Sequence, residues 1–335
     1  MAAVTEQSKR AQDRNFAAYP PAIFLMGPTA SGKSAIALQV ARYLPIEIVN
    51  VDSAQVYRDM NIGTAKPDAE ALAVAPHHLI DLIGPDERYS AARFRSDAIA
   101  KMREITDRGN IPLLAGGTML YFKALLEGLS ELPSADSDVR TAIETKADES
   151  GWPAMHKELS RLDPDSAARI KPMDSQRIQR ALEVCYLTGK PMSEALKKPV
   201  TTALPYRAVK MALIPSNRNA LHQRIAQRFE QMLKRGLIDE VCAIRDKFSV
   251  NAESPSMRCV GYRQVWMYLE GETDRAKMHE MALAASRQLA KRQLTWLRLM
   301  KGVEEFDCLQ ENLPEQVRRY LLDMLSTGMK SAEVS

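Results

Sequence analysis

Gly27-Pro28-Thr29-Ala30-Ser31-Gly32-Lys33-Ser34 decides the fold, because this stretch has the form G-x-x-x-x-G-K-[ST]. Residues 22–26 before it predict a buried strand, and residues 35–44 after it predict a helix. The glycines let successive backbone N–H groups turn inward, and the helix N-terminus adds its positive dipole end. Lys33 supplies a full charge to a terminal phosphate, and the Ser34 hydroxyl suits the ligand shell of a Mg²⁺ ion. The stretch therefore predicts a diphosphate-binding loop, but it does not say which phosphate compound binds.

Composition is that of an ordinary soluble globular protein. The chain has 335 residues, of which 45% are hydrophobic and 26% are charged. Its net charge of +4 is too small to indicate a polyanionic partner by itself. The four cysteines lie far apart with no C-x-x-C pair, which argues against a zinc site or a disulfide framework and favours a reducing cytosol. Residues 1–20 lack an apolar core and predict a flexible extension, and no run approaches the ~18 apolar residues of a membrane span.

Polar side chains follow several of the predicted strands. Apolar runs at 47–51, 77–83, 111–115, 211–214 and 303–307 predict strands that alternate with helices. Since parallel strands end at one edge of a sheet, Asp52 and the Thr118 of a second glycine-rich turn should lie near Lys33. Asp52 is thus a candidate for chemistry, although an Asp here also suits the N-cap of the following turn.

Two further regions carry polar side chains that could bind a partner. From about 133 to 205 the strands stop and helical segments at 138–150, 153–162 and 174–187 follow, which predicts an inserted subdomain or lid. Its segment 176–180 carries long polar side chains that could bind a partner, although a solvated helix face has the same composition. Residues 286–301 hold five basic residues and no acid, interleaved with Gln, Thr and Trp. That mixture suits a phosphodiester backbone and splayed bases, although an amphipathic helix with a charged outer face explains it as well.

Longer stretches resemble the bacterial tRNA dimethylallyltransferase family, also called tRNA isopentenyltransferases, between about residues 21 and 310. The resembling stretches are GPTASGKS, VDSAQVYRDMNIGTAKP, PHHLID, YSAARFRSDA, GGTMLYFKALLEGLSELPSAD, DSQRIQRALEV, PSMRCVGYRQVW and RQLAKRQLTWLR. The resemblance implies an α/β fold with a P-loop NTPase-like parallel sheet core. It assigns 21–132 and 206–310 to this core and its C-terminal helices, 133–205 to a helical insertion that clamps the tRNA anticodon stem-loop, and 311–335 to a C-terminal tail.

The resemblance also implies a reaction. The family transfers a dimethylallyl group from dimethylallyl diphosphate to N6 of adenosine 37 in tRNA, and it releases diphosphate without ATP hydrolysis. Asp52 would take the proton from the amine, Thr118 would orient the amine or the bridging oxygen, and Arg263 would add a cation beside the diphosphate. Mg²⁺ would bind at Ser34, where relatives commonly have Thr.

The residues that the resemblance places against tRNA come from four segments and two single positions. They are Asp52, Ser53, Ala54, Gln55, Thr118, Arg140, Gln176, Arg177, Ile178, Gln179, Arg180, Arg258, Cys259, Val260, Gly261, Tyr262, Arg263, Lys291, Arg292, Gln293, Leu294, Thr295, Trp296, Leu297 and Arg298.

Three other functions remain open at this point. A small-molecule P-loop kinase explains the loop, Asp52 and a helical lid, but not the acid-free basic stretch. A non-catalytic RNA-binding module would not need the intact Lys33, Ser34 and Asp52. A transferase acting on free AMP would not need an anticodon clamp. We expect a cytoplasmic monomer whose partners are tRNA and dimethylallyl diphosphate.

Overall fold

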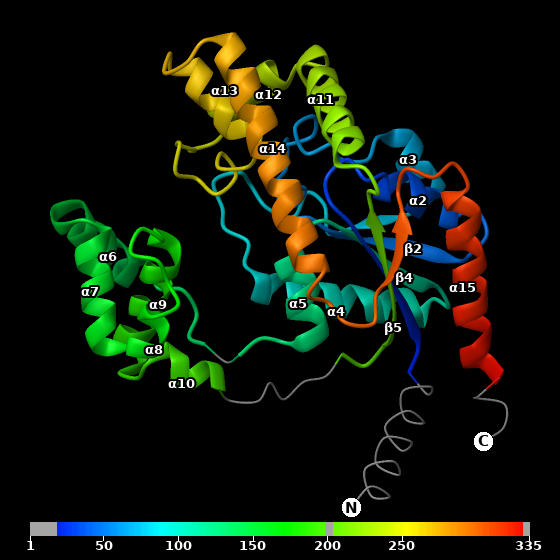
Figure 1. Ribbon diagram of the computed structural model, residues 1–335, viewed down its shortest axis with the longest axis horizontal. Helices are drawn as coiled ribbons and strands as arrows, with labels where there is room; N and C mark the ends of the chain where they lie inside the picture. The colour runs from blue at the N-terminus through cyan, green and yellow to red at the C-terminus, as the bar shows by residue number, and fades with distance from the viewer. Residues whose placement is uncertain (1–18, 131, 198–203, 331–335) are drawn as a thin grey trace, which may run out of the picture. The chain divides into compact units, whose positions relative to one another are not determined.

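The structure, a computed structural model, describes residues 19–130, 132–197 and 204–330, and its strands form one parallel sheet (Figure 1). The strands are β1 (Pro21–Met26), β2 (Ile46–Val51), β3 (His77–His78), β4 (Ile111–Gly116), β5 (Arg207–Ile214) and β6 (Glu304–Asp307). Their spatial order is β3-β2-β4-β1-β5-β6, and every pairing is parallel. The predicted α/β class with a parallel core is confirmed. Most of the predicted N-terminal extension, residues 1–18, lies outside the described residues.

The helices alternate with these strands except between β4 and β5 and between β5 and β6, where several helices follow one another. They are α2 (Lys33–Val40), α3 (Ala69–Val74), α4 (Ala91–Asp107), α5 (Met119–Glu127), α6 (Ser137–Ser150), α7 (Trp152–Leu162), α8 (Pro164–Ala167), α9 (Ser175–Thr188), α10 (Met192–Lys197), α11 (Arg218–Lys234), α12 (Leu237–Lys247), α13 (Tyr262–Leu269), α14 (Arg275–Leu297) and α15 (Leu313–Lys330).

The predicted strand at 77–83 is much shorter than expected. Only His77 and His78 pair with β2, because Leu79 and Asp81 adopt positive φ angles of 61° and 54° that turn the chain out of the ladder. His78 Nε2 lies 2.6 Å from Glu47 Oε2 on β2, and His77 Nδ1 lies 2.9 Å from the Ala75 carbonyl. Both histidines therefore have structural partners.

One face of the sheet is covered by α2 and α15. Because side chains alternate along a strand, Ile23 and Leu25 of β1 share this face and pack in one buried cluster with Ile36 of α2 and Val317 and Leu321 of α15. The prediction of a C-terminal tail from residue 311 is therefore wrong for α15. Its helical spacing places Leu313, Val317 and Leu321 in the core.

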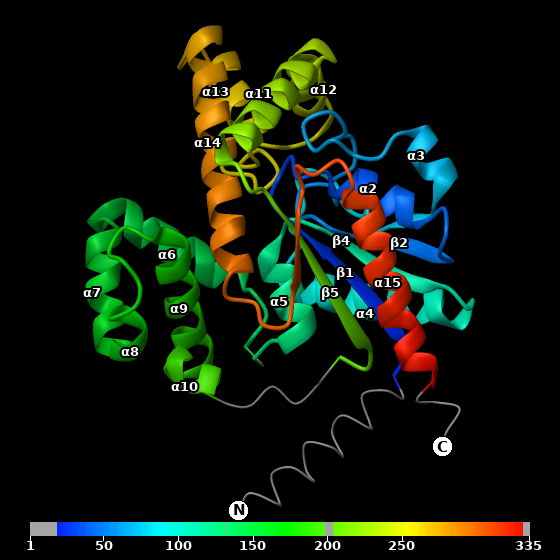
Figure 2. The same ribbon diagram turned by 45° about the vertical axis from the view of Figure 1, so that its right-hand side comes forward.

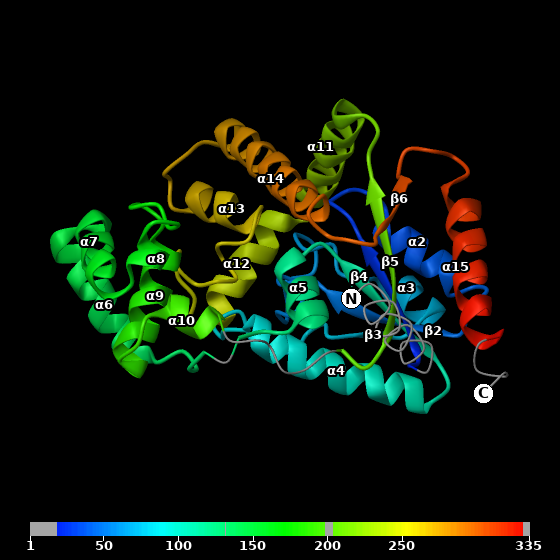
Figure 3. The same cartoon turned by 60° about the horizontal axis from the view of Figure 1, so that its bottom comes forward.

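The other face is covered by α4 and α5 (Figure 3). Phe24 of β1 faces Phe122 of α5 with ring centroids 6.1 Å apart, and Phe94 of α4 stacks on Tyr121 at 4.3 Å. The Ser90 side chain caps the start of α4 by accepting the Arg93 N–H.

The helices α11, α12, α13 and α14 gather beyond the carboxyl ends of the strands (Figure 2). They share an apolar cluster that includes Phe229 and Met232 of α11, Tyr262 of α13 and Met278 of α14. This arrangement places a buried helical wall opposite the sheet edge at which Lys33, Asp52 and Thr118 begin their turns.

Two compact units make up the chain. One holds the sheet and comprises the residues up to Leu125 and from Pro205 onward, and the other spans Leu126–Leu204. Every element in the described part of the second unit is a helix, α6 to α10, packed around Ile143, Leu159, Ile178 and Leu182.

A buried carboxylate joins β2, β3 and the turn before β4. Glu47 is 4% exposed and accepts bonds from Arg108 Nε at 2.9 Å and Asn110 Nδ2 at 2.8 Å, beside His78. The Arg108 hydrogen bond, with further bonds from Asn110 and His78, outweighs burial and lowers the pKa of Glu47 to about 2.

We expect Glu47→Gln to destabilise the protein by about 1–3 kcal/mol at neutral pH, because it leaves the Arg108 guanidinium without its anion. Since the folded pKa lies below the unfolded value of about 4.3, the contribution is present above that pH and is lost as the pH falls toward about 2. Urea unfolding at pH 7 and pH 3 measures this, with the exposed Glu104→Gln as control. If the free energies of unfolding of wild type and Glu47→Gln differ by the same amount at both pH values, the account is contradicted.

Candidate active site

The loop between β1 and α2 has the geometry of an anion cradle. Ala30 and Gly32 adopt positive φ angles of 62° and 85°, which direct successive N–H groups to one side of the loop. At Gly27 a Cβ would lie 2.6 Å from Ser31 Oγ and 3.0 Å from the Leu213 carbonyl oxygen, so a larger residue would displace these groups. Ser31 Oγ is buried and has no hydrogen-bond partner among the described residues.

Lys33 and Ser34 line a cavity of about 330 Å³. Its wall is strongly basic, since α11 adds Arg224 and Arg228. Lys33 Nζ donates to the Pro28 carbonyl at 2.7 Å. Burial, followed by the nearby Arg228 guanidinium, lowers the pKa of Lys33 to about 8, while Asp52 opposes this shift. A partly desolvated lysine beside an arginine is a strong site for a polyanion.

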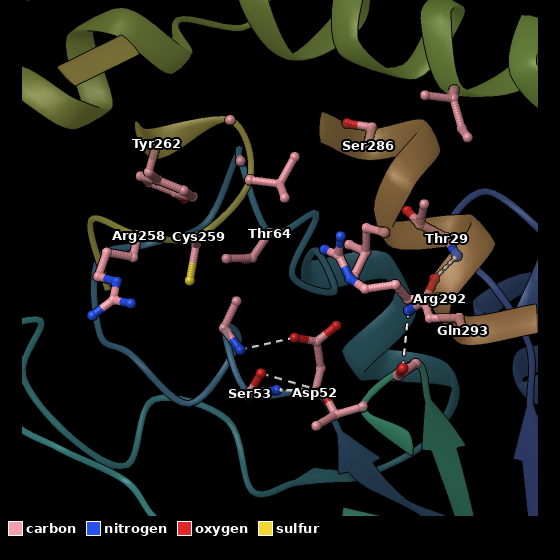
Figure 4. A pocket seen from close by; sticks show the side chains of 18 of the residues that line it. Thr29, Asp52, Ser53, Thr64, Arg258, Cys259, Tyr262, Ser286, Arg292 and Gln293 are labelled. Atoms are coloured by element: carbon pink, nitrogen blue, oxygen red, sulfur yellow. Dashed lines mark hydrogen bonds between the residues drawn. The ribbon is translucent and has the colours of Figure 1, made fainter. Parts of the chain in front are cut away.

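A second cavity, of about 500 Å³, lies at the same edge of the sheet (Figure 4). Cavities of about 300–1,000 Å³ hold drug-sized ligands. Asp52, Ser53, Ala54, Gly117 and Thr118 line it from the strand ends, and Ile225, Arg228, Phe229 and Met232 line it from α11. Arg258 to Tyr262, together with Ser286, Leu289, Arg292, Gln293 and Trp296 of α14, form much of the remaining wall.

Arg228 belongs to the walls of both cavities. Burial lowers the pKa of Arg228, and the Asp52 carboxylate acts against this shift. A guanidinium keeps its charge at any working pH, so Arg228 places a fixed cation between the phosphate loop and Asp52.

Asp52 and Thr118 are held by bonds to neighbouring turns. Asp52 Oδ1 accepts the Ala54 N–H at 2.8 Å, so this carboxylate caps its own turn and also lines the cavity. Thr118 Oγ1 accepts the Ser53 N–H at 3.0 Å. At Gly116, a Cβ would meet the Val51 carbonyl oxygen at 2.0 Å, and this close approach joins the β2 and β4 ends. Both predicted catalytic residues therefore face one cavity.

A half-buried glutamate holds together the wall of this cavity that contains Gly63 and Tyr262. Glu240 of α12 accepts N–H groups from Asn61 at 2.9 Å, Ile62 at 2.7 Å and Gly63 at 3.1 Å, and it accepts the Tyr262 hydroxyl. The Tyr262 ring lies against Gly63, where a Cβ would be 2.5 Å from the ring. Burial raises the pKa of Cys259 in the same wall to about 12, so its thiol stays neutral.

Several residues predicted to contact RNA lie elsewhere. Gln55 donates to the Thr64 and Ala65 carbonyls at 3.0 and 3.3 Å, and Leu294 and Leu297 are 8% and 2% exposed, packed inward from α14. A separate cavity between α11 and α14 is lined by Lys291, Leu294, Thr295 and Arg298.

Arg263 is not at the diphosphate site. It is exposed on α13 and lines neither cavity, because this short helix turns its neighbours Tyr262, Val265 and Trp266 inward. The position foreseen for Arg263 is held by Arg228 instead. Arg224 and Arg228 were not predicted from the sequence. Two signals could have indicated them: arginines four positions apart share a helix face, and α11 follows β5, the strand that pairs with β1.

The residues predicted in the helical unit have different surroundings. Ile178 is fully buried in that unit's core and cannot touch RNA. Arg140 Nε and Arg180 donate to the buried Glu183 at 2.8 and 2.6 Å, so one carboxylate compensates two guanidinium groups. Arg177 is exposed and pairs with Asp174. Gln179 Nε2 donates to Glu144 at 2.7 Å.

The residues around Ser34 fit a Mg²⁺ ion that is bound together with a diphosphate. Ser34 is exposed at the basic cavity, and a hydroxyl is a typical oxygen ligand for this ion. Among the described residues no three His, Cys, Asp or Glu side chains cluster as a metal site. Phosphate and water oxygens would therefore complete the shell.

The fold and the site define a P-loop protein in which Arg228 lines both the phosphate cavity and a second cavity. The family model described as IPP transferase matches residues 55–300. The tRNA dimethylallyltransferase of Nitrosospira multiformis is 76% identical over 96% of this chain and 98% of its own length. The tRNA dimethylallyltransferase of Nitrosomonas europaea is 64% identical over 89% of this chain and 94% of its own length.

Solved structures agree with this comparison. The tRNA isopentenylpyrophosphate transferase of Bacillus halodurans is 34% identical, with a TM-score of 0.68 over 94% of this chain and 98% of that chain. A eukaryotic dimethylallyltransferase described as acting on tRNA is 26% identical, with a TM-score of 0.77 over 92% of this chain and 80% of that chain. The chain belongs to the tRNA dimethylallyltransferase family, as its motifs implied. No helix in the part of the chain that the structure describes is long and apolar enough to cross a membrane.

We predict that the affinity for an alkyl diphosphate falls as the pH rises above about 8, where Lys33 of the free protein loses its proton. Below that pH Lys33 is charged in both states and the affinity is flat. Above it, each pH unit costs up to about tenfold, because binding must then recover the proton. Calorimetric titration between pH 7 and 10 measures this. Lys33→Arg should show no such fall, and equal slopes in the two proteins would exclude Lys33 as the cause.

Proposed function

We propose that this chain transfers a dimethylallyl group from dimethylallyl diphosphate to N6 of adenosine 37 in tRNA and releases diphosphate. Arg228 carries the proposal, because it borders both the cavity of Lys33 and Ser34 and the cavity of Asp52 and Thr118. A leaving diphosphate and an accepting base can therefore meet beside one cation. The relatives named tRNA dimethylallyltransferase and the neighbour described as acting on tRNA support these substrates.

The phosphate cavity stabilises the leaving group. As the allylic C–O bond breaks, negative charge develops on the diphosphate, and Lys33, Arg228 and the loop N–H groups lie where this charge forms. A Mg²⁺ ion held by Ser34 and the diphosphate would add Lewis-acid stabilisation of the same oxygens. The loop therefore binds diphosphate as a leaving group and moves no phosphoryl group.

Asp52 removes the proton from the amine. The N6 lone pair is delocalised into the adenine ring, so the amine is a weak nucleophile until a base takes its proton as the C–N bond forms. The Ala54 N–H orients the carboxylate, and Thr118 lies beside it on the same cavity. Thr118 Oγ1 can then contact the amine or the bridging oxygen.

The acceptor base enters from the anticodon loop. A base that reacts at its edge must leave its stack, and aromatic and guanidinium groups hold such flipped bases. Trp296, Arg292 and Arg258 line the cavity, and Lys123 Nζ lies 5.9 Å from the Trp296 ring centroid. We place the anticodon stem on the helical unit 126–204 and the reaction in the cytoplasm, with the protein acting as a monomer.

The direct assay combines labelled dimethylallyl diphosphate with unmodified bulk tRNA, an anticodon stem-loop or free AMP. Label should enter the tRNA and the stem-loop at adenosine 37. Equal transfer to AMP would contradict an RNA acceptor, and ATP-dependent phosphorylation of a small alcohol with unmodified tRNA would support a kinase.

We expect Asp52→Asn to lower kcat by about 10²–10⁴, because the amide keeps an oxygen for the Ala54 N–H but cannot take a proton. Single-turnover kinetics and tRNA binding measure the effect, and tRNA affinity should not change. Asp59→Asn, at an exposed carboxylate paired with Lys247, is the matched control. A kcat within twofold of wild type would remove Asp52 from the role of base.

Arg228→Gln and Arg263→Gln separate the two candidate cations. The first should lower kcat by about 10²–10³, since it removes a charge that stabilises the departing diphosphate. The second should leave kcat within about twofold, because Arg263 lines neither cavity. Steady-state kinetics with saturating tRNA decides between them, and the reverse order of effects would restore Arg263 to the site.

A further inference from the structure

Gln293 of α14 joins the two glycine-rich turns of the active site. Its Oε1 accepts the Thr29 N–H of the phosphate loop at 2.9 Å, and its Nε2 donates to the Gly117 carbonyl at 2.9 Å. Gln293 is 7% exposed, and its bond to Gly117 is buried while its bond to Thr29 is partly buried. Figure 4 shows the amide between the two turns.

The space around this amide is closely fitted. A Cβ at Gly117 would lie 2.4 Å from Gln293 Nε2, so this glycine leaves room for the side chain. An amide is the group that suits the position, since one end must accept a hydrogen bond and the other must donate one. Both ends of Gln293 are used inside the protein, which conflicts with its expected role as an RNA contact.

The neighbours of Gln293 on α14 face the acceptor cavity. Arg292 and Trp296 lie one position before and three positions after it, and both line this cavity. One rigid helix therefore carries groups that face the acceptor and a group that holds the phosphate loop. Thr118, which follows Gly117, is tied to the end of β2 through the Ser53 N–H at 3.0 Å.

We propose that Gln293 is a positioning residue that fixes the spacing between the diphosphate loop and the Asp52–Thr118 side of the site. The inference rests on the proposed transfer reaction and deepens it. The amide ties α14, the loop at Thr29 and the turn at Gly117 into one body, so the leaving group and the accepting amine keep their reacting distance. A displacement of about 1 Å between reacting groups can cost 10²-fold in rate.

Two substitutions test the amide. Gln293→Met keeps the length of the side chain but neither hydrogen bond, and it should lower kcat about 10- to 100-fold while the KM for dimethylallyl diphosphate stays within about threefold. Gln293→Glu keeps the acceptor for Thr29, but its carboxylate repels the Gly117 carbonyl until it is protonated. Its kcat relative to wild type should therefore rise as the pH is lowered from 8 to 6. Gln288→Met, at an exposed glutamine of the same helix, is the control.

Hydrogen exchange at the Thr29 amide tests the brace without the reaction. In Gln293→Met this amide should exchange about threefold to tenfold faster than in wild type, as expected for the loss of one hydrogen bond. Unchanged exchange would overturn the brace. Faster exchange with a wild-type kcat would overturn the positioning role. Absence of transfer by the wild-type protein would instead contradict the proposed function, and the exchange result would still decide whether the brace exists.

Discussion

The active site depends on two half-buried cations, Lys33 and Arg228, that lie near each other, and among the described residues no carboxylate is bonded to either. Burial lowers the pKa values of Lys33 and Arg228, and the Arg228 guanidinium lowers that of Lys33 further. Such an arrangement is unfavourable in the free protein and becomes favourable when a polyanion binds. The fold supplies the stability that holds these charges together, through a six-stranded parallel sheet covered on both faces.

The same constraint explains why the phosphate loop sits at this edge of the sheet. Strands β1, β2 and β4 are neighbours and end together, so the turns that follow them deliver Lys33, Asp52 and Thr118 to one place. The helix after β5 adds Arg228 there, because β5 pairs with β1 on the other side. Chemistry at the carboxyl ends of parallel strands thus follows from strand order.

Much of this arrangement could be predicted from the sequence. The loop motif, the apolar strands and the polar residue after each strand predicted that Asp52 and Thr118 lie at one edge of the sheet, because these are local patterns with a known geometry, and both residues line one cavity. Arg228, Arg263 and Gln293 could not be placed, since their roles depend on which face of a distant helix packs inward. The early end of β3 could not be predicted either, because the positive φ angles that end it occur at Leu79 and Asp81, which are not glycines.

The most direct measurement of the central claim follows the bridging oxygen of dimethylallyl diphosphate. When that oxygen carries oxygen-18, cleavage of the C–O bond leaves the label in the released diphosphate, and the dimethylallyl group appears on the base. The account predicts this outcome with an anticodon stem-loop as acceptor. Label in released dimethylallyl phosphate with a phosphoryl group on the acceptor, or in dimethylallyl alcohol with a diphosphoryl group on the acceptor, would show transfer of phosphorus and contradict the account.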